Sequence, residues 1–422
     1  MNNHYPSPSF DEQTASLLTP QGRGAISTIR LNGDCRFIDA ATPSLFHATN
    51  SKPLGDQPIG RVLFGRWGSY IKEDIVVCRI DEHTTEIHCH GGDAAAARIL
   101  GDLEALGCRI ETWQQLMATL GGRFDAEALE ALTRASTSRV ADILLEQQSG
   151  LLRSAIGEIR DRLSHWLVEP ENDRKTQSSP LPQRGGTNGE TAPESDTVCQ
   201  DIACQDIADR IDALLGWSDF GLHLTAPWSV VLAGRPNVGK SSLINVLVGF
   251  ARSIVYDRPG TTRDVVTVET AFDGWPVQLS DTAGIYQAAE PLESAGIDRA
   301  RSTLAATDCR ILLIDTSRPP HEDDHRLLQA WPGAILVAHK CDLPNIWGAE
   351  IPTGAFPVSS LTGEGIEALA EILLAALIPK IPDPGTPIPF TQRQVNLLEQ
   401  AREALGQNAK ATCLAVLDEC LG

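Results

Sequence analysis

The sequence contains no run of about 18 consecutive apolar residues, roughly the length that a helix needs to cross a bilayer. Its N-terminal stretch, MNNHYPSPSFDEQT, lacks the apolar core of a secretory signal. The ten cysteines are scattered along the 422 residues, so free thiols are expected rather than a disulfide framework. These absences predict a cytoplasmic protein that does not associate with membranes.

Positive charge is also scarce. Lys and Arg number 35 against 55 Asp and Glu, which gives a formal net charge of −20. This balance argues against general coating of nucleic acid by a basic surface, although it leaves room for a local basic groove. No internal repeat is evident, and a chain of this length is expected to form two or three domains.

One segment is almost devoid of large apolar residues. Residues 169–196 are rich in Pro, Gly, Ser, Thr and charge, which predicts a linker or disordered insert. Apolar residues recur at three- and four-residue spacing over 124–167, 202–215 and 392–405. Helices are therefore expected in these three ranges.

The pattern changes between the second and third helical ranges. Short apolar runs at 229–233, 277–280, 310–314 and 334–337 alternate with helical stretches. This alternation predicts a parallel sheet with helices on both faces. Because helical patterns lie on both sides, the simplest fold is an α/β domain inserted in an α-helical domain.

The N-terminal region mixes the two patterns. Short strands are expected at 25–31 and 75–80 and a helix at 93–106, which indicates a small α+β domain in front of the other two. The predicted domains cover 10–118 (N-terminal), 119–222 (first helical part, with the insert at about 169–196), 226–380 (α/β) and 385–422 (second helical part).

A phosphate-binding loop follows the first apolar run of the α/β region. Residues 234–241, GRPNVGKS, fit the pattern G-x-x-x-x-G-K-[ST] between a predicted strand and a predicted helix. The glycines let backbone N–H groups converge on phosphates, Lys240 reaches the β- and γ-phosphates, and Ser241 is a Mg²⁺ ligand. A P-loop nucleotide hydrolase is therefore predicted.

Two further motifs are typical of the switch regions of such enzymes. Asp281 begins DTAG at the end of a predicted strand, where it is expected to support Mg²⁺ while the Gly284 N–H senses the γ-phosphate. The loop PGTTRD at 259–264 contains a threonine expected to complete the Mg²⁺ shell. Spacing alone does not choose between Thr261 and Thr262.

The sequence HKCD at 339–342 has the place of a guanine-recognition loop, but His339 stands where Asn is usual. Asp342 is expected to accept hydrogen bonds from guanine N1–H and the exocyclic amine, a pairing that adenine does not offer. The run Ser359-Ser360-Leu361 resembles the loop that backs the base. GTP preference is expected to survive through Asp342, with weaker affinity because His339 donates only one N–H.

The usual means of hydrolysis are missing from the motifs. Ile285 follows DTAG where a Gln would orient the attacking water, and no arginine finger can be assigned. Asn237, inside the phosphate loop, is an oxygen donor near the phosphates and is a candidate ligand for a monovalent cation. The alternative is that Asn237 only caps the loop.

Together, these motifs resemble one family. GRPNVGKSS (234–242), GTTRD (260–264), DTAGI (281–285) and ESAGIDRA (293–300) look like the G domain of the MnmE (TrmE) tRNA-modification GTPases. TPQGRGAISTIR (19–30) and HGG (90–92) resemble that family's N-terminal domain. The resemblance is strong in the G domain, moderate at the N-terminus and weak in the helical region.

The resemblance implies a set of ligands. Asn237, the backbone of Tyr256 and Arg258, and Thr261 would bind K⁺, which takes the place of an arginine finger as two G domains dimerise. Ser241 and Thr262 would bind Mg²⁺, with Lys240 and Glu293 as the catalytic residues, Glu293 orienting the nucleophile through a water. The implied GTP-binding residues are Asn237, Val238, Gly239, Lys240, Ser241, Ser242, Tyr256, Thr261, Thr262, Asp281, Thr282, Ala283, Gly284, His339, Lys340, Asp342, Ser359, Ser360 and Leu361.

The resemblance also implies partners. The N-terminal domain would dimerise and bind a tetrahydrofolate derivative through Arg30, Glu86 and Arg123. The flavoprotein MnmG would act with the GTPase to add a carboxymethylaminomethyl group to the wobble uridine of tRNA.

The sequence departs from the family at three places, and the shortened C-terminal tail favours a second hypothesis. RIDEHTTE (79–86) replaces the family's Asn-Ser-Phe-Thr-Gly-Glu-Asp stretch, His339 replaces Asn, and only about 30 residues follow Phe390. The terminal Cys420-Leu-Gly resembles the family's Cys-Ile-Gly-Lys end, but chance similarity is the favoured reading. The alternative is a regulatory GTPase of the Era or Der type, which acts in ribosome assembly and does not modify tRNA.

Overall fold

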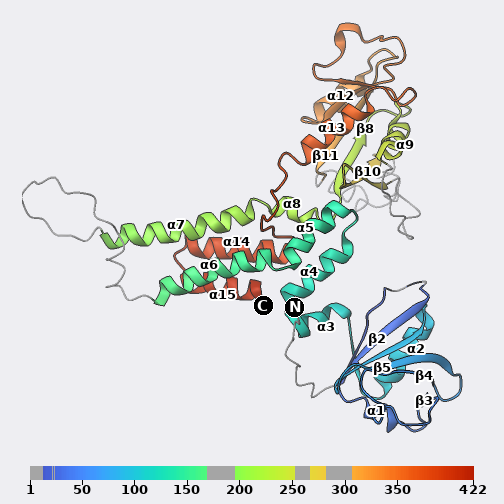
Figure 1. Cartoon of the computed structure of the whole chain (residues 1–422). Helices are drawn as coiled ribbons and strands as arrows, with labels where there is room; N and C mark the ends of the chain where they lie inside the picture. Colours follow the sequence, from blue (N-terminus) through green and yellow to red (C-terminus); the bar gives the residue numbers. More distant parts are fainter. Residues whose placement is uncertain (1–12, 21, 23, 169–194, 252–266, 282–306) are drawn as a thin grey trace, which may run out of the picture. The chain divides into compact units, whose positions relative to one another are not determined.

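In the computed structural model, residues 13–20, 22, 24–168, 195–251, 267–281 and 307–422 are described. The chain divides into two compact units, Met1–Glu130 with Gly422 and Ala131–Leu421. Among the described residues each unit contains one β-sheet, and Figure 1 labels many of the helices and strands. The predicted insert at 169–196 lies almost wholly outside the described residues.

The first unit is built on a seven-stranded sheet in the order β3-β4-β5-β6-β2-β1-β7. All neighbouring strands are antiparallel except β1 and β7, which are parallel. The strands expected at 25–31 and 75–80 and the helix expected at 93–106 are present, as β2, β5 and α2. The elements are β1 Thr14–Leu17, β2 Ile26–Asn32, α1 Arg36–Asp39, β3 Phe46–Ala48, β4 Val62–Trp67, β5 Glu73–Arg79, β6 Thr84–His90, α2 Asp93–Ala105, β7 Arg109–Glu111 and α3 Trp113–Gly121.

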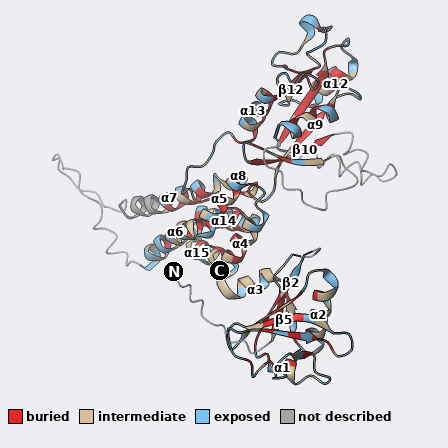
Figure 2. Ribbon diagram, turned by 45° about the vertical axis from the view of Figure 1, so that its right-hand side comes forward, coloured by how far each residue is buried: buried red, intermediate tan, exposed pale blue. Residues whose placement is uncertain are grey.

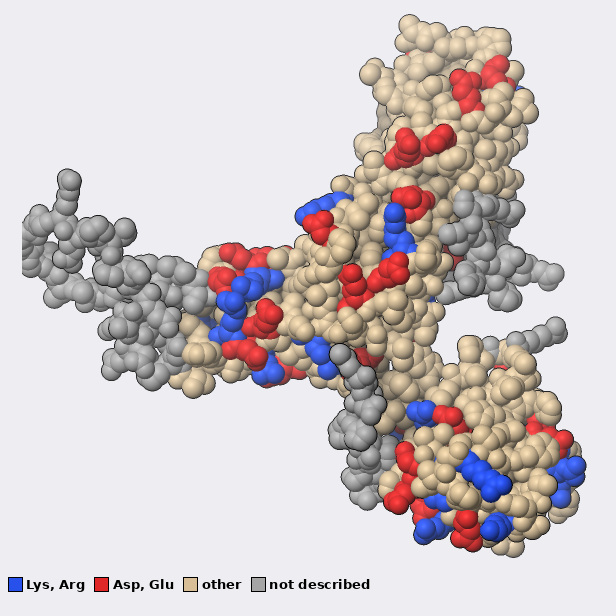
Figure 3. Space-filling view, viewed as in Figure 1, with Lys and Arg blue, Asp and Glu red and all other residues tan. Residues whose placement is uncertain are grey.

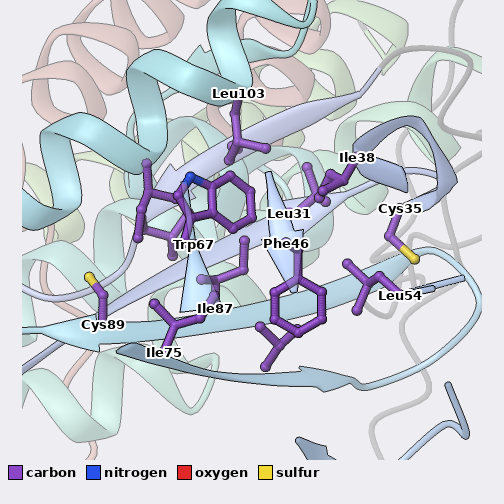
Figure 4. Packing of buried hydrophobic residues seen from close by; sticks show 14 of the residues in the cluster. Leu31, Cys35, Ile38, Phe46, Leu54, Trp67, Ile75, Ile87, Cys89 and Leu103 are labelled. Atoms are coloured by element: carbon purple, nitrogen blue, oxygen red, sulfur yellow. The ribbon is translucent and has the colours of Figure 1, made fainter. Parts of the chain in front are cut away.

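One face of this sheet carries the core of the unit. Alternate residues of each strand point to the same face, so Ile75 and Val77 of β5 and Ile87 and Cys89 of β6 are buried together. Trp67 and Leu103 lie in the same cluster, which Figure 4 shows from close by. Trp67 is fully buried, and its indole N–H donates to the Asp102 carboxylate at 2.9 Å, so its polar atom is satisfied.

The helical pattern at 124–167 is not one helix but three. Thr137 caps α5 by accepting from the Val140 N–H at 3.3 Å, and Gly150, at φ +105°, separates α5 from α6. The other expected helices, at 202–215 and 392–405, are present within α7 and α14. The elements are α4 Arg123–Arg134, α5 Ser138–Gln148, α6 Leu151–Val168, α7 Ser195–Leu215, α8 Ser218–Leu222, α14 Gln392–Gly406 and α15 Lys410–Leu421.

Helices from both ends of the second unit pack together. The C-terminal helix α15 lies against α6, and α14 lies against α7 and α15. Their contact is apolar, with Ile159 and Leu163 of α6, Ile211 of α7 and Leu398 of α14 buried. On the face drawn in Figure 3, the Lys and Arg side chains of this helical region lie among Asp and Glu side chains. The ion pairs Arg160–Asp418 (3.4 Å) and Arg162–Asp206 (3.3 Å) belong to this pattern.

The second sheet has six strands in the order β13-β12-β11-β8-β10-β9. The central strands are almost continuously apolar and buried (red in Figure 2), as expected for strands covered on both sides. Helix α9 packs against β9 and β10, while α12 and α13 each contact β11. The elements are β8 Trp228–Ala233, α9 Lys240–Ala251, β9 Thr267–Phe272, β10 Trp275–Asp281, β11 Cys309–Asp315, α12 Glu322–Ala330, β12 Ile335–His339, η2 Gly348–Glu350, β13 Phe356–Val358 and α13 Ile366–Leu377.

The four strands expected from the sequence, β8, β10, β11 and β12, are parallel as predicted, but the sheet also contains β9, which was not predicted. β9 runs antiparallel to β10, whereas all other neighbours are parallel. Two residues, Asp273 and Gly274, connect β9 to β10, and both have positive φ (+48° and +79°). This is the backbone of a tight hairpin turn, and Asp-Gly is a favoured sequence for it. Such a short connection permits only antiparallel pairing.

Asp308, just before β11, ties this strand to β8. Its carboxylate accepts hydrogen bonds from the Ser229 N–H (2.6 Å) and hydroxyl (2.7 Å) and lies 3.4 Å from His223 Nε2. Burial by itself would raise the pKa of Asp308, but hydrogen bonds from His223 and Ser229 outweigh it and lower the pKa to about 2. Burial alone would lower the pKa of His223, but hydrogen bonding to Asp308 outweighs it and raises that pKa.

Asp308→Asn is therefore expected to destabilise the fold by about 2 kcal/mol at pH 6, where both charges of the pair are present. The Asp308 part of this stability is present above pH 3.8 and is lost as pH falls through about 2. The His223 part is present below pH 6.5 and is lost as pH rises through its raised pKa. Urea unfolding at pH 6 and pH 3 measures the effect, and an equal difference between variant and parent at both values would contradict it.

Candidate nucleotide-binding site

The phosphate loop connects β8 to α9. Gly234 follows the last residue of β8, and Lys240 is the first residue of α9, so the predicted strand–loop–helix order is present. Asn237 and Gly239 both have positive φ (+63° and +110°), which turns the backbone back toward the helix. Helix α9 begins directly after this loop, and the first N–H groups of a helix have no partner within the helix, which is the arrangement that binds phosphate.

The basic and acidic residues of the loop lie close together. The Lys240 ammonium donates to the carbonyls of Gly234 (3.1 Å) and Arg235 (3.3 Å) and lies 3.8 Å from an Asp281 oxygen. The Ser241 hydroxyl lies 3.1 Å from the other Asp281 oxygen. Because β10 runs parallel to β8 beside it, the end of β10 brings Asp281 to the phosphate loop, 40 residues away in sequence. The hydroxyl oxygen of Ser241 and the carboxylate oxygen of Asp281 are the kind of ligands that Mg²⁺ prefers.

The base-recognition segment begins at the end of β12. Lys340 has φ +62°, and the Asp342 carboxylate accepts the Ser359 hydroxyl at 2.5 Å. The Ser359 oxygen also accepts the N–H groups of Leu361 and Thr362, both at 3.2 Å. Ser359 therefore holds the carboxylate of Asp342 and the loop that follows β13 in one geometry. The Leu361 side chain is 85% exposed beside them.

His339 occupies a different position from the one expected for a base contact. It is the last residue of β12, is only 3% exposed, and both ring nitrogens have protein partners. Nδ1 lies 2.8 Å from the Val238 carbonyl oxygen, and Nε2 lies 2.7 Å from the Ser360 hydroxyl. The single N–H assigned to the base from the sequence is therefore used within the protein. Burial lowers the pKa of His339, which favours the neutral ring.

Lys340 and Asp315 form a second link to the phosphate loop. The Lys340 ammonium lies 2.6 Å from the Asp315 carboxylate and 3.3 Å from the Asn237 carbonyl oxygen. Burial alone would raise the pKa of Asp315, but hydrogen bonds from Lys340 and Ser317 outweigh it and lower the pKa. Asp315 was not among the site residues predicted from the sequence. The sequence feature that could have identified Asp315 is its place as an acidic residue at the carboxyl end of β11, because functional side chains in parallel sheets lie at the carboxyl ends of the strands.

Several predicted residues lie outside the described part of the chain. They include the whole threonine loop, the DTAG residues after Asp281, and the proposed catalytic glutamate. These are Tyr256, Arg258, Thr261, Thr262, Thr282, Ala283, Gly284 and Glu293.

The structure brings together two of the three predicted folate residues in the first unit. Arg30 of β2 and Glu86 of β6 face each other across the sheet and form an ion pair of 2.6 Å. Arg123 lies on α4, where its guanidinium pairs with Glu127 at 3.3 Å. The Arg30 Nε atom is buried without a hydrogen-bond partner among the described residues.

His88, Cys89 and His90 alternate along β6, with Cys89 buried and His90 exposed. No group of three or more His, Cys, Asp or Glu suited to a metal ion occurs among the described residues. None of the described helices is long and apolar enough to cross a bilayer.

Comparison with known proteins extends these observations. A family model described as 50S ribosome-binding GTPase matches residues 229–340. The G domain of the T. maritima FeoB iron transporter is 29% identical and covers 35% of this chain and 98% of its own, with a TM-score of 0.26. Era in complex with MgGDPNP and a 16S ribosomal RNA fragment is 25% identical and covers 42% of this chain and 66% of its own, with a TM-score of 0.28.

Longer matches come from curated relatives. The tRNA modification GTPase MnmE of Geobacillus kaustophilus is 33% identical over 78% of this chain and 73% of its own length. The protein of the same name from Moorella thermoacetica is 31% identical over 95% of this chain and 90% of its own length. The protein of the same name from Symbiobacterium thermophilum is 32% identical over 95% of this chain and 90% of its own length.

The phosphate loop, its Asp281 partner and the Asp342 segment at the ends of parallel strands define a P-loop GTPase, an enzyme that hydrolyses GTP. The long matches extend over nearly the whole chain, well beyond the α/β sheet. The chain belongs to the MnmE family of tRNA modification GTPases.

Proposed function

We propose that this GTPase acts with the flavoprotein MnmG to add a carboxymethylaminomethyl group to the wobble uridine, U34, of tRNA. The observation that carries the proposal is the extent of the similarity, which reaches over 95% of the chain at 31% identity. A GTPase domain alone would support only nucleotide hydrolysis. Similarity beyond that domain supports the family's particular task.

We propose Mg²⁺ as the metal of the phosphate site, held by Ser241 and Thr262. The 3.1 Å approach of the Ser241 hydroxyl to Asp281 supports the Ser241 half, because Asp281 can hold a metal-bound water while Ser241 ligates directly. Mg²⁺ held there would offset the negative charge of the phosphates. Lys240, buried at the start of α9, supplies a fixed positive charge to the same oxygens.

We propose K⁺ as the second cation, bound by Asn237, Thr261 and the backbone of Tyr256 and Arg258, with Glu293 orienting the attacking water. Two features of the chain support it: Ile285 has no polar group to orient water, and Asn237 lies exposed at the turn of the phosphate loop. A monovalent cation there would supply the charge of an arginine finger.

Replacement of K⁺ by Na⁺ at the same ionic strength is therefore expected to lower GTP turnover by at least about tenfold, because ligands spaced for K⁺ hold the smaller Na⁺ poorly and the charge at the transition state is lost with the ion. Steady-state phosphate release in KCl and NaCl measures this. Equal rates in the two salts would contradict the proposed role of K⁺, but they would not bear on the assignment of the GTP-binding site.

The first unit is proposed to form a homodimer and to bind a tetrahydrofolate derivative, with Arg30, Glu86 and Arg123 as ligands. The Arg30 Nε atom is buried and has no hydrogen-bond partner in the described part of the chain, which supports an acceptor ligand there, because a buried guanidinium nitrogen without a partner is costly. Glu86, 2.6 Å from Arg30, would accept hydrogen bonds from the ligand's amino groups.

The domain organisation is proposed in the form expected from the sequence: N-terminal residues 10–118, helical parts 119–222 and 385–422, and the GTPase domain 226–380. The packing of α14 and α15 against α6 and α7 supports insertion of the α/β domain between two parts of one helical domain.

The second candidate is a regulatory GTPase that acts in ribosome assembly and does not modify tRNA. The family description of 50S ribosome-binding GTPase over residues 229–340 favours it. A deletion strain complemented with the wild-type gene, or with a Lys240→Ala gene, distinguishes the two. Mass spectrometry of tRNA nucleosides is expected to show loss of the carboxymethylaminomethyl group in the deletion strain and its return only with the wild-type gene. An unchanged nucleoside profile on deletion would exclude the first function.

A further inference from the structure

We propose that His339 is a positioning residue that fastens the phosphate loop to the loop after β13, and that it makes no contact with the guanine base. This deepens the nucleotide site described above. In the MnmE-type motif an Asn has this position, so the replacement is a property of this chain.

The hydrogen bonds fix the tautomer of the ring. The Val238 carbonyl oxygen can only accept, so the 2.8 Å contact places the proton on Nδ1. Nε2 is then an acceptor and receives the Ser360 hydroxyl at 2.7 Å. A neutral imidazole has one donor and one acceptor, and both are used. No N–H of His339 remains for N7 or O6 of guanine.

The packing around the ring supports a fixed position. His339 is 3% exposed, and a Cβ added at Gly239 would lie 2.4 Å from its Cε1 and 2.6 Å from its Nδ1. The imidazole therefore lies directly against the phosphate-loop backbone, in space that only a glycine leaves. Gly239 also has φ +110°, so a side chain there would meet strain as well as the ring.

Burial is the largest cause of the lowered pKa of His339, and the surrounding charges act in opposite directions: Lys340 lowers this pKa, whereas Asp315 and Asp342 raise it. The charged groups that act on His339 are Lys340 and Asp342 from its own segment and Asp315 from β11. Lys340 is paired with Asp315 at 2.6 Å, and Asp342 is held by the Ser359 hydroxyl, so neither carboxylate is hydrogen-bonded to the imidazole. Burial therefore keeps the ring neutral, and through its two nitrogens the ring joins residues 101 and 21 positions away in sequence.

His339 could either hold the phosphate loop in place, here called a brace, or contact the base. These two roles predict different effects on nucleotide binding. A brace positions the phosphate loop, so its loss weakens every nucleotide equally. A base contact through N7 would make 7-deaza-GDP, which lacks that acceptor, bind more weakly than GDP. We therefore expect the wild-type protein to bind GDP and 7-deaza-GDP with equal affinity.

The test uses His339→Leu, which keeps the buried volume and removes both hydrogen bonds, and His339→Asn, which restores the amide donor to the Val238 carbonyl. Calorimetric titration with Mg²⁺ and GDP is expected to give about tenfold weaker binding for His339→Leu, since two hydrogen bonds of ordinary strength are lost. The affinity of His339→Leu for 7-deaza-GDP is expected to fall by the same factor. His339→Asn is expected to recover affinity for GDP to within about threefold of wild type.

Ser360→Ala provides a second variant in case His339→Leu does not fold. This variant removes the hydrogen bond between the Ser360 hydroxyl and His339, in a loop of intermediate exposure. It is expected to weaken the binding of GDP and of 7-deaza-GDP by about threefold each. Its effect should not add to that of His339→Leu in a double variant, because both break the same link. Two outcomes would overturn the proposal: wild-type discrimination between GDP and 7-deaza-GDP that His339→Leu abolishes, or unchanged GDP affinity in both single variants.

Discussion

Lys240→Ala is expected to lower GTP turnover by about 100- to 1,000-fold, the usual cost of removing one preorganised charge from a transition state. The Lys240 ammonium is 8% exposed and is held between the carbonyls of Gly234 and Arg235 at the start of α9. From there we propose that it reaches the β- and γ-phosphates, on which charge develops during phosphoryl transfer. Phosphate release at saturating GTP and calorimetric GTP affinity measure the two effects separately.

Lys52→Ala is the matched control, because Lys52 is exposed in the first unit and belongs to no predicted site. Its turnover is expected to equal that of the wild type. If Lys240→Ala binds GTP and releases phosphate at the wild-type rate, the loop at 234–241 does not hold the triphosphate. The assignment of the catalytic site would then be wrong.

Asp342→Asn is expected to reverse the choice of base. Guanine presents N1–H and an exocyclic amine, and both donate to a carboxylate; the amide has only one acceptor and directs a donor at the amine. Xanthine has a carbonyl oxygen in place of that amine, which the new amide N–H can bond. GTP affinity should fall by at least about 100-fold and XTP affinity should rise, as expected where buried polar groups are mispaired.

Competition of GTP, XTP and ATP against a fluorescent GDP derivative measures this switch. The Ser359 hydroxyl, 2.5 Å from the Asp342 oxygen, can also donate to the amide oxygen and should keep the side chain in place. Asp383→Asn is the control, an exposed carboxylate before α14. ATP that competes as well as GTP with the wild-type protein would refute the role given to Asp342.

The fold was predictable where a segment's local pattern agrees with its tertiary role. The apolar runs at 229–233 and 310–314 became β8 and β11 because central parallel strands are buried on both faces and need continuous apolar sequence. Strand β9 was not predicted at all, and the local signal for it is the Asp273–Gly274 turn that joins it to β10. The helix breaks near Thr137 and Gly150 were missed because apolar periodicity continues across them, while the cap and the positive φ are single-residue signals.

By itself, the sequence determined the phosphate loop, the DTAG aspartate and the base-recognition aspartate. Each is a short motif whose residue types are required by the chemistry of the triphosphate and of guanine. Only the tertiary structure decided what His339 and Asp315 do. Their partners, Val238 and Lys340, are separated from them by 101 and 25 residues, and they meet because parallel strands bring their carboxyl ends to one edge of the sheet. Local sequence does not specify which nitrogen of a buried imidazole meets which distant carbonyl, because that contact is set by the packing of the whole sheet.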